Sequence, residues 1–402
     1  MEVEKIKAAA QDSLKDVVGW RRHLHEHPEV GFDLKNTMAY VCSVLDELGV
    51  EHEANEKGSY VVAYINRGKP GKTIAVRADM DALPVQEETG LEFASKEPGK
   101  MHACGHDVHT ACLLGLAKVL KGMEGELNGS VKLLFQPAEE LGTGSPVLIA
   151  DGVLDDVDEV VGMHNGNLGD GAEPGDLVFS TGPMMATMDK FTLTIKGQGA
   201  HGSTPQASID PITIASYVIT SLQEIISREC DPRDAAVITI GSIHGGDAFN
   251  IIPDTCELAG TTRVFTNEMR DFIERRIGEV AEGVAKAYRA DIVYKFFRQP
   301  PPLVNDKGVA EKLIEVSNEL YPDNTRMMQK LCMAGEDFAW YLQKKPGAFF
   351  FFCNPKPIDG KCWPHHNSKF AIDETHLDRP MAVFAGIVAS ELAEGVGHGR
   401  EG

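Results

Sequence analysis

The sequence predicts an α/β fold: a central mixed sheet flanked by helices, with a second α+β domain inserted into it. Three observations predict it. Short apolar runs typical of strands alternate with helical segments over residues 1–181 and again over 299–402. The intervening segment 182–298 instead follows a β-α-β-β-α-β order, as in a ferredoxin-like sandwich. Gly182-Pro183 and Pro300-Pro301-Pro302 interrupt regular structure at its two ends.

The first segment opens with two helices. A helix is expected over 4–27, because Pro28 cannot continue it. A second is expected over 35–48, because Gly49 ends it. The hydrophobic pattern then predicts, in chain order, strands over 61–65 and 73–77, a helix over 108–120, and strands over 131–135 and 157–163.

The inserted and final segments continue this pattern with their own elements. The insert is predicted to contain strands over 190–196, 236–243, 256–265 and 291–298, and helices over 210–228 and 267–289. The final segment is predicted to contain helices over 308–320, 336–343 and 376–393, and strands over 325–329 and 348–353. Residues 395–402 are expected to form a disordered tail.

Composition limits the partners of this 402-residue chain. Its formal net charge of -21 argues against nucleic acid and anionic membranes, which require clustered Lys and Arg. No segment approaches the ~18 apolar residues of a membrane helix, and the N-terminus lacks the apolar core of a secretory signal. The eight cysteines show no paired spacing, which predicts reduced thiols in a cytoplasmic protein.

The run Met101–His109 is the richest in chemistry, because it places a thiol, three imidazoles and a carboxylate just before a predicted helix. Side chains of this kind, so close together, usually bind a transition metal. Gly105 allows the backbone to turn so that Cys104 and His106 face one cavity. We interpret Asp107 and His109 as groups that cap the helix or support the ligands.

Carboxylates follow two other predicted strands. Neighbouring residues in an extended chain point in opposite directions, so one of Glu139 and Glu140 can bind a metal while the other addresses a water. A solvated acidic turn is the alternative. Asp79 and Asp81 could be ligands or could orient histidines from behind them; we favour the second, although a role in stabilising the loop fits equally well.

Histidines and one arginine complete the candidate residues. His164 ends a strand and is interpreted as a metal ligand. Of the pair His365-His366 only one would reach a given metal, and we favour His366. His201 could donate to a developing oxyanion or be an ordinary surface histidine. Arg263, within a strand of small and apolar residues, requires a carboxylate from the protein or from a substrate. Because the ligand-bearing loops of the first segment follow strands, they are expected to meet where open α/β sheets bind ligands.

These motifs together resemble the M20 metallopeptidases, in the branch of hippurate hydrolases, aminoacylases and auxin-conjugate amidohydrolases. The matching stretches span nearly the whole chain: Arg22–His25, Arg77–Pro84, Met101–His109, Gln136–Glu140, Gly162–His164, His201–Pro205, Asn250–Pro253, Gly260–Arg263, Gly335–Phe338 and His365–Glu374. The resemblance implies a zinc-peptidase-like catalytic domain formed by 1–181 and 299–402. It also implies that 182–298 is a lid and dimerisation domain.

The resemblance also implies a site with two divalent ions, whose identity among Mn, Zn, Co and Ni stays open. The implied metal ligands are Cys104, His106, Glu140, His164 and His366, with Asp79 and Asp81 behind them. Glu139 would be the general base, and His201 would act at the active site of a partner subunit in a homodimer or higher homo-oligomer. The implied substrate contacts are Asn250 and Arg263 for a free carboxylate and the Gly335 backbone.

The implied activity is metal-dependent hydrolysis of N-acyl amino acids to a carboxylic acid and a free amino acid. Peptidase branches carry a histidine at the position of Asp79, which favours the amidohydrolase branch here. A metallo-carboxypeptidase or dipeptidase is the first alternative. A non-catalytic protein that binds a metal or ligand is the second, and the presence of Glu139 argues against it.

Overall fold

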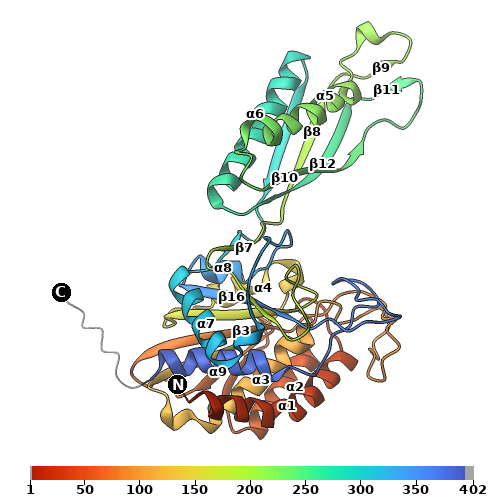
Figure 1. Ribbon diagram of the computed structural model, residues 1–402. Coiled ribbons are helices and arrows are strands. Elements are labelled where there is room, and N and C mark those ends of the chain that lie inside the picture. Colours follow the sequence, from red (N-terminus) through yellow and green to blue (C-terminus); the bar gives the residue numbers. More distant parts are fainter. Residues whose placement is uncertain (1, 394–402) are drawn as a thin grey trace, which may run out of the picture. The chain divides into compact units, whose positions relative to one another are not determined.

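The computed structural model describes residues 2–393; the predicted disordered tail 395–402 lies outside the described residues. The chain forms two compact units (Figure 1). The first comprises Met1–Gly182, Asn305–Lys330 and Trp340–Gly402, and the second comprises Pro183–Val304 and Leu331–Ala339. The second unit therefore extends beyond the predicted segment 182–298 and takes in a short piece that the sequence placed with the catalytic domain.

The first unit is built on an eight-stranded mixed sheet. Its strands, in sheet order, are β1 (Glu51–Asn55), β2 (Tyr60–Ile65), β4 (Gly129–Gln136), β3 (Lys72–Asp79), β5 (Glu159–Gly166), β16 (Gly347–Cys353), β6 (Leu177–Phe179) and β15 (Thr325–Met327). Strands β4, β3, β5 and β16 run parallel to one another. Because both faces of parallel strands are covered, β5 and β16 are buried along their whole length, which explains the continuous apolar sequence of β16.

Helices bury the faces of this sheet. They are α1 (Val3–Glu26), α2 (Lys35–Glu47), α3 (His106–Gly122), α4 (Gly144–Ala150), α7 (Lys307–Leu320), α8 (Ala339–Leu342) and α9 (Asp378–Glu391). Helix α3 packs against α1, α9 and β3. A side chain at Gly115 would meet Met381 and Val17, so this glycine permits the close approach of the three helices.

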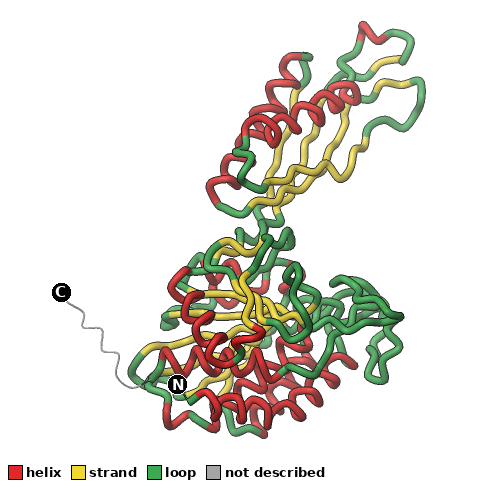
Figure 2. Tube along the Cα trace, viewed as in Figure 1, coloured by secondary structure: helices red, strands yellow, loops and turns green. Residues whose placement is uncertain are grey.

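The second unit contains a four-stranded antiparallel sheet in the order β10 (Ala236–His244), β12 (Thr255–Val264), β8 (Asp189–Lys196) and β13 (Asp291–Phe297). Helices α5 (Pro211–Glu224) and α6 (Asn267–Ala287) lie together on it (Figure 2). Asp210 and Thr266 cap these helices by accepting backbone N–H groups. Two short pairs complete the unit: β9 (Ala200–His201) with β11 (Ile251–Ile252), and β7 (Pro183–Met185) with β14 (Leu303–Val304).

The predicted α/β class, with its mixed sheet and inserted β-α-β-β-α-β unit, is confirmed. Individual elements differ. The predicted helix over 336–343 is only the single turn α8, and the predicted helix over 210–228 ends in a π-helical turn at Ile225–Glu229. Strand β1 was not predicted, because its polar sequence lies exposed at the sheet edge and carries no alternation of apolar residues. None of the helices within residues 2–393 has the length and apolar character that a membrane crossing requires.

Candidate metal centre

The parallel strands bring polar residues together at their C-terminal ends, which form one edge of the sheet. Asp79 is the last residue of β3, and it pairs with Gln136 at the end of β4, three residues before Glu139. His164 lies on the neighbouring strand β5, which continues to Gly166, so it does not end its strand as predicted. Because β3 is parallel to both neighbours, the predicted convergence of these segments follows from the strand order.

Two histidines present their Nε2 atoms to this edge. The Nδ1 of His106 lies 2.8 Å from the Asp81 carbonyl oxygen, and the Nδ1 of His164 lies 2.8 Å from that of Asn165. A carbonyl can only accept, so each Nδ1 carries a proton, and in the neutral ring Nε2 keeps a lone pair. The Cys104 sulfur lies 3.4 Å from the Nε2 of His164. Thiol and imidazoles therefore face one another.

Gly105 makes this arrangement possible. Its φ of +89° is left-handed, and a Cβ there would lie 2.6 Å from the Asn165 side-chain oxygen. Helix α3 begins directly after it, at His106. Asp107 therefore lies within the first turn of the helix rather than at its cap, which leaves the other interpretation, that it supports the ligands.

The two glutamates follow β4 in a tight turn. Glu139–Leu141 is a 3₁₀ turn entered through Ala138, whose φ of 52° is unusual for a residue with a side chain. The expectation of an extended chain with divergent carboxylates was wrong, because both carboxylates lie 4.0 Å from the His106 Nε2. Asp81 holds the turn by accepting the backbone N–H of Glu139 at 3.0 Å and of Glu140 at 3.3 Å.

A second set of contacts lies behind these residues. Asp79 accepts a hydrogen bond from the Nδ1 of His109, and the Nε2 of His109 accepts the backbone N–H of Asn165 at 3.0 Å. Both ring nitrogens of His109 are thus engaged, which fits a supporting position. The carbonyl of Asn165 also accepts from His164 and His365, so this residue orients three histidines. The sequence reasoning missed Asn165, since its contacts are mostly through the backbone and leave no motif.

The structure separates the two adjacent histidines near the C-terminus. His365 donates from Nε2 to the Asn165 carbonyl at 3.0 Å, and burial lowers its pKa to about 4. His366 places its Nε2 3.3 Å from the Glu140 carboxylate. Its backbone is left-handed, with a φ of 64°, and its N–H donates to the Ala103 carbonyl at 2.8 Å. Of the pair, only His366 faces the carboxylate of a predicted ligand.

Five sets of potential donor atoms lie close together among the described residues, and two of these sets consist entirely of predicted metal ligands. One contains Cys104, His106 and His164, the other contains Cys104, Glu140 and His366, and within each group the atoms lie within 4.8 Å of one another. All five predicted metal ligands thus gather in two sets that share Cys104.

The buried atoms of these groups fit divalent cations. Within the part of the chain that the structure describes, His106 Nε2 and Glu140 Oε1 are buried without a hydrogen-bond partner, and a buried polar atom in this state is costly unless something else satisfies it. Burial raises the pKa of the Cys104 thiol well above its ordinary value and lowers the pKa of His164 well below its own. A neutral imidazole such as that of His164 is a ready ligand, and a cation would supply the positive charge that a buried thiolate requires.

The remaining predicted residues belong to the second unit. His201 lies exposed on β9, beside β11, and the Asn250 carbonyl accepts the backbone N–H of Gly202 at 2.8 Å. Arg263 on β12 is half-buried, and burial lowers the pKa of its guanidinium. It donates to the Thr261 hydroxyl at 2.5 Å and the Thr262 carbonyl at 2.9 Å. Among the described residues, no carboxylate accepts a hydrogen bond from it.

Gly335 also lies in the second unit, in the piece 331–339. A Cβ there would lie 2.3 Å from the Met188 side chain. A side chain at this position would therefore require Met188 to shift.

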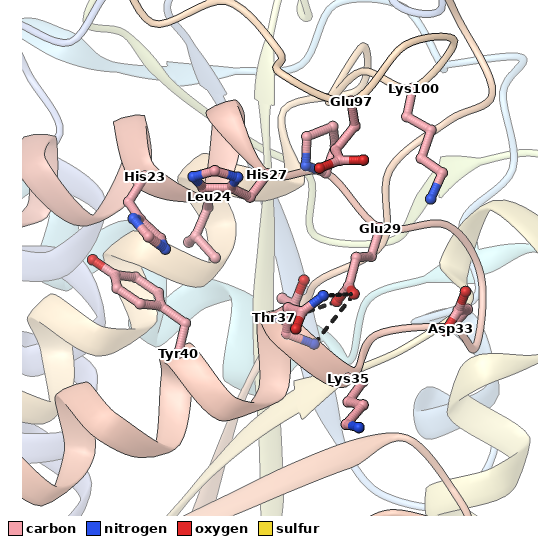
Figure 3. Close-up of a pocket in the computed structure, with 12 residues that line it drawn as sticks. His23, Leu24, His27, Glu29, Asp33, Lys35, Thr37, Tyr40, Glu97 and Lys100 are labelled. Carbon is pink, nitrogen blue, oxygen red and sulfur yellow. Dashed lines mark hydrogen bonds between the residues drawn. The ribbon is translucent and has the colours of Figure 1, made fainter.

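A separate cavity of about 510 Å³ lies between the end of α1 and the start of α2. Figure 3 shows Glu29 and Thr37 among its lining residues, with Glu29 accepting backbone N–H groups at the start of α2. None of the predicted metal ligands lines this cavity. The donor chemistry therefore places the candidate site at the sheet edge rather than here.

A mixed α/β sheet with thiol, imidazole and carboxylate groups at the ends of its parallel strands defines the class of metallohydrolases with an inserted domain. The chain belongs to peptidase family M20/M25/M40, whose family description matches residues 75–390.

Three similar proteins agree with this assignment. An N-acetyl-L-cysteine deacetylase of Bacillus subtilis is 41% identical over 90% of this chain and 85% of its own. Thermostable carboxypeptidase 1 of Saccharolobus solfataricus is 38% identical over 93% and 95%. The crystal structure of a dinuclear metal binding peptidase of the M20 family from Bacillus subtilis matches 95% of this chain and 99% of its own, with a TM-score of 0.83 and 34% identity.

Proposed function

We propose that the protein is a metal-dependent amidohydrolase that cleaves N-acyl amino acids into a carboxylic acid and a free amino acid. The observation that carries the proposal is the pair of donor groups sharing Cys104, with His106 and Glu140 each contributing a buried atom free of hydrogen bonds within residues 2–393. Family membership supports hydrolysis of an amide bond. The relative named N-acetyl-L-cysteine deacetylase supports an N-acyl amino acid as the substrate class.

Two divalent cations, of Mn, Zn, Co or Ni, would be held by Cys104, His106, Glu140, His164 and His366. When bound, they supply the Lewis acidity that polarises an amide carbonyl and eases deprotonation of water. Glu139 acts as the base: it takes a proton from the attacking water and returns it to the departing amine nitrogen. Its burial and the hydrogen bond from its backbone to Asp81 keep the carboxylate in place for both transfers.

The second unit supplies the substrate contacts in this proposal, as a lid. Arg263 pairs with the free carboxylate of the substrate, together with Asn250, because within the described residues its guanidinium hydrogen-bonds only to a hydroxyl and a carbonyl. His201 donates to the oxyanion from a subunit of the same kind, and the Gly335 backbone contacts the substrate. The half-buried position of Arg263 strengthens a charge pair, since partial burial reduces screening by water.

A substrate panel tests this function. With manganese- or zinc-loaded protein, we expect N-acetyl and N-benzoyl amino acids to be hydrolysed faster than dipeptides and faster than the same amino acids blocked as carboxamides. Arg263→Met should lower kcat/KM for the free acids by about 10- to 100-fold, the worth of a hydrogen bond to a charged group, and leave the carboxamides unchanged. Arg275→Met, at an exposed arginine on α6, is the matched control. Equal losses on acids and carboxamides would refute the role of Arg263.

A carboxypeptidase is the second candidate, favoured by the relative of that name from Saccharolobus solfataricus. It would use the same cations, Glu139 and Arg263, since a peptide substrate also ends in a free carboxylate. The panel separates the two activities: faster release of the C-terminal residue from peptides than from N-acetyl amino acids would favour the carboxypeptidase. Bound metal without hydrolysis of any amide would favour a binding protein instead.

A homodimer formed through the second unit completes the proposal. Strand β10 is one edge of its sheet, and residues 236–243 carry no charged side chain, whereas the opposite edge β13 contains Asp291 and Lys295. An uncharged edge strand is a template for pairing with another chain. Sedimentation velocity should show a dimer that Ile243→Lys converts to a monomer, while Val293→Lys on β13 leaves it intact. A monomeric wild-type protein would contradict this assembly.

A further inference from the structure

Arg21 is a deeply buried arginine that pairs with two separate carboxylates. It lies on α1 with 1% of its surface exposed. Its Nε donates to Asp107 at 2.7 Å, and its Nη1 donates to Glu374 at 3.0 Å. No step of the proposed reaction uses these three residues.

The two carboxylates belong to two of the segments that carry predicted ligands. Asp107 follows His106 directly in the first turn of α3. Glu374 ends the segment 365–374, defined here as the C-terminal ligand segment because it contains His366. Arg21 therefore links the first donor group to the segment that completes the second.

The C-terminal ligand segment is also attached elsewhere: His365 donates to the Asn165 carbonyl at 3.0 Å, and the Asp373 N–H donates to the Asn354 carbonyl at 2.8 Å. The N–H of His366 bonds to Ala103, and Ser368 bonds through its carbonyl and hydroxyl to Glu88. At its far end, Glu374 accepts from Arg21 and, at 2.6 Å, from Arg22. A left-handed backbone at a residue with a side chain costs on the order of 1–3 kcal/mol and persists only where its surroundings enforce it, so His366 depends on these contacts.

The Asp107 side of the link is more firmly held. His25 contacts the same Asp107 oxygen at 2.9 Å, and its other ring nitrogen lies 3.3 Å from Glu87. His106 is fixed independently by its bond to the Asp81 carbonyl. Loss of the Glu374 contact should therefore disturb His366, which lies on the same segment, more than it disturbs His106 and His164.

We infer that Arg21 and Glu374 are positioning residues that set the affinity of the cation held by Cys104, Glu140 and His366, separately from the cation held by Cys104, His106 and His164. The inference rests on the two-cation site of the proposed function. Contacts behind the ligands commonly change metal affinity by about 10- to 100-fold when removed. The structure places that effect on one of the two cations.

The experiment is a titration of metal-free protein with Mn²⁺. Binding is measured by calorimetry and by the electron paramagnetic resonance signal of free Mn²⁺. Wild type should bind two equivalents. Glu374→Gln, which keeps the shape but removes the charge, should weaken one equivalent by about 10- to 100-fold and leave the other within threefold. For the weakened equivalent, the affinity of Arg21→Lys should fall between those of wild type and Glu374→Gln. Glu51→Gln, the same change at the exposed pair with Arg67, is the control and should match wild type.

Three outcomes would overturn the inference. They are two unaltered equivalents in Glu374→Gln, equal weakening of both equivalents, and fewer than two equivalents in wild type. Thermal unfolding of the metal-free variants checks that each is folded. Because the readout is cation binding, two equivalents in wild type without amide hydrolysis would remove the proposed function and leave this inference standing.

Discussion

Glu139→Gln is expected to lower kcat by about 10²–10⁴, the usual contribution of a general base, while both cations stay bound. The amide cannot accept a proton from water or return it to the amine. Its size and backbone contacts are unchanged, so the turn held by Asp81 should persist. Steady-state kinetics on an N-acetyl amino acid, with metal content measured on the same samples, checks both halves of the statement.

The neighbouring glutamate provides the contrast for that variant. Glu140 belongs to a donor group, and its carboxylate lies 3.3 Å from His366. Glu140→Gln should therefore lose a cation as well as activity, whereas Glu124→Gln, on the surface, should change neither. Full activity in Glu139→Gln would remove this residue from the role of base.

Cys104→Ala should have the largest effect on cation binding, because Cys104 is the member common to both donor groups. Removal of contacts behind a ligand already costs about 10- to 100-fold in affinity, so loss of a shared ligand should weaken both cations by more than about 100-fold. Hydrolysis should fall to background. Calorimetric titration of the metal-free variant with Mn²⁺ or Zn²⁺ measures the change.

Two single-group variants provide the comparison for Cys104. His164→Ala removes a member of one group only, and His366→Ala removes a member of the other only. Each should retain one equivalent of cation near its wild-type affinity. If Cys104→Ala kept two equivalents, the sulfur would not be a shared ligand, and the arrangement of the centre would have to be revised.

Several elements could be predicted from the sequence because their signals are local. Pro28 and Gly49 end α1 and α2 close to where they were placed, since backbone restrictions act within a residue or two. The apolar strands β4, β5 and β16 were also found, because a buried parallel strand must be apolar on both faces. The polar edge strand β1 has no such requirement and was missed.

Site chemistry could be predicted only as far as residue type. The run around Cys104 and the pair Glu139-Glu140 indicated a metal and a base, because few other functions gather these side chains. The geometry could not be deduced in the same way. The pair forms a 3₁₀ turn after a left-handed Ala138, and Asp107 pairs with Arg21 rather than capping its helix.

The sequence by itself determined the fold class, the family and the kinds of donor atoms, since these depend on local pattern and on side-chain chemistry. The tertiary structure alone decided which atoms meet. His366 rather than His365 faces Glu140, Cys104 joins both donor groups, and Arg21 links segments more than 250 residues apart in sequence, Asp107 and Glu374. The physical reason is that these contacts arise from strand order and from helices packed across the sheet, which bring distant residues together without a local signal.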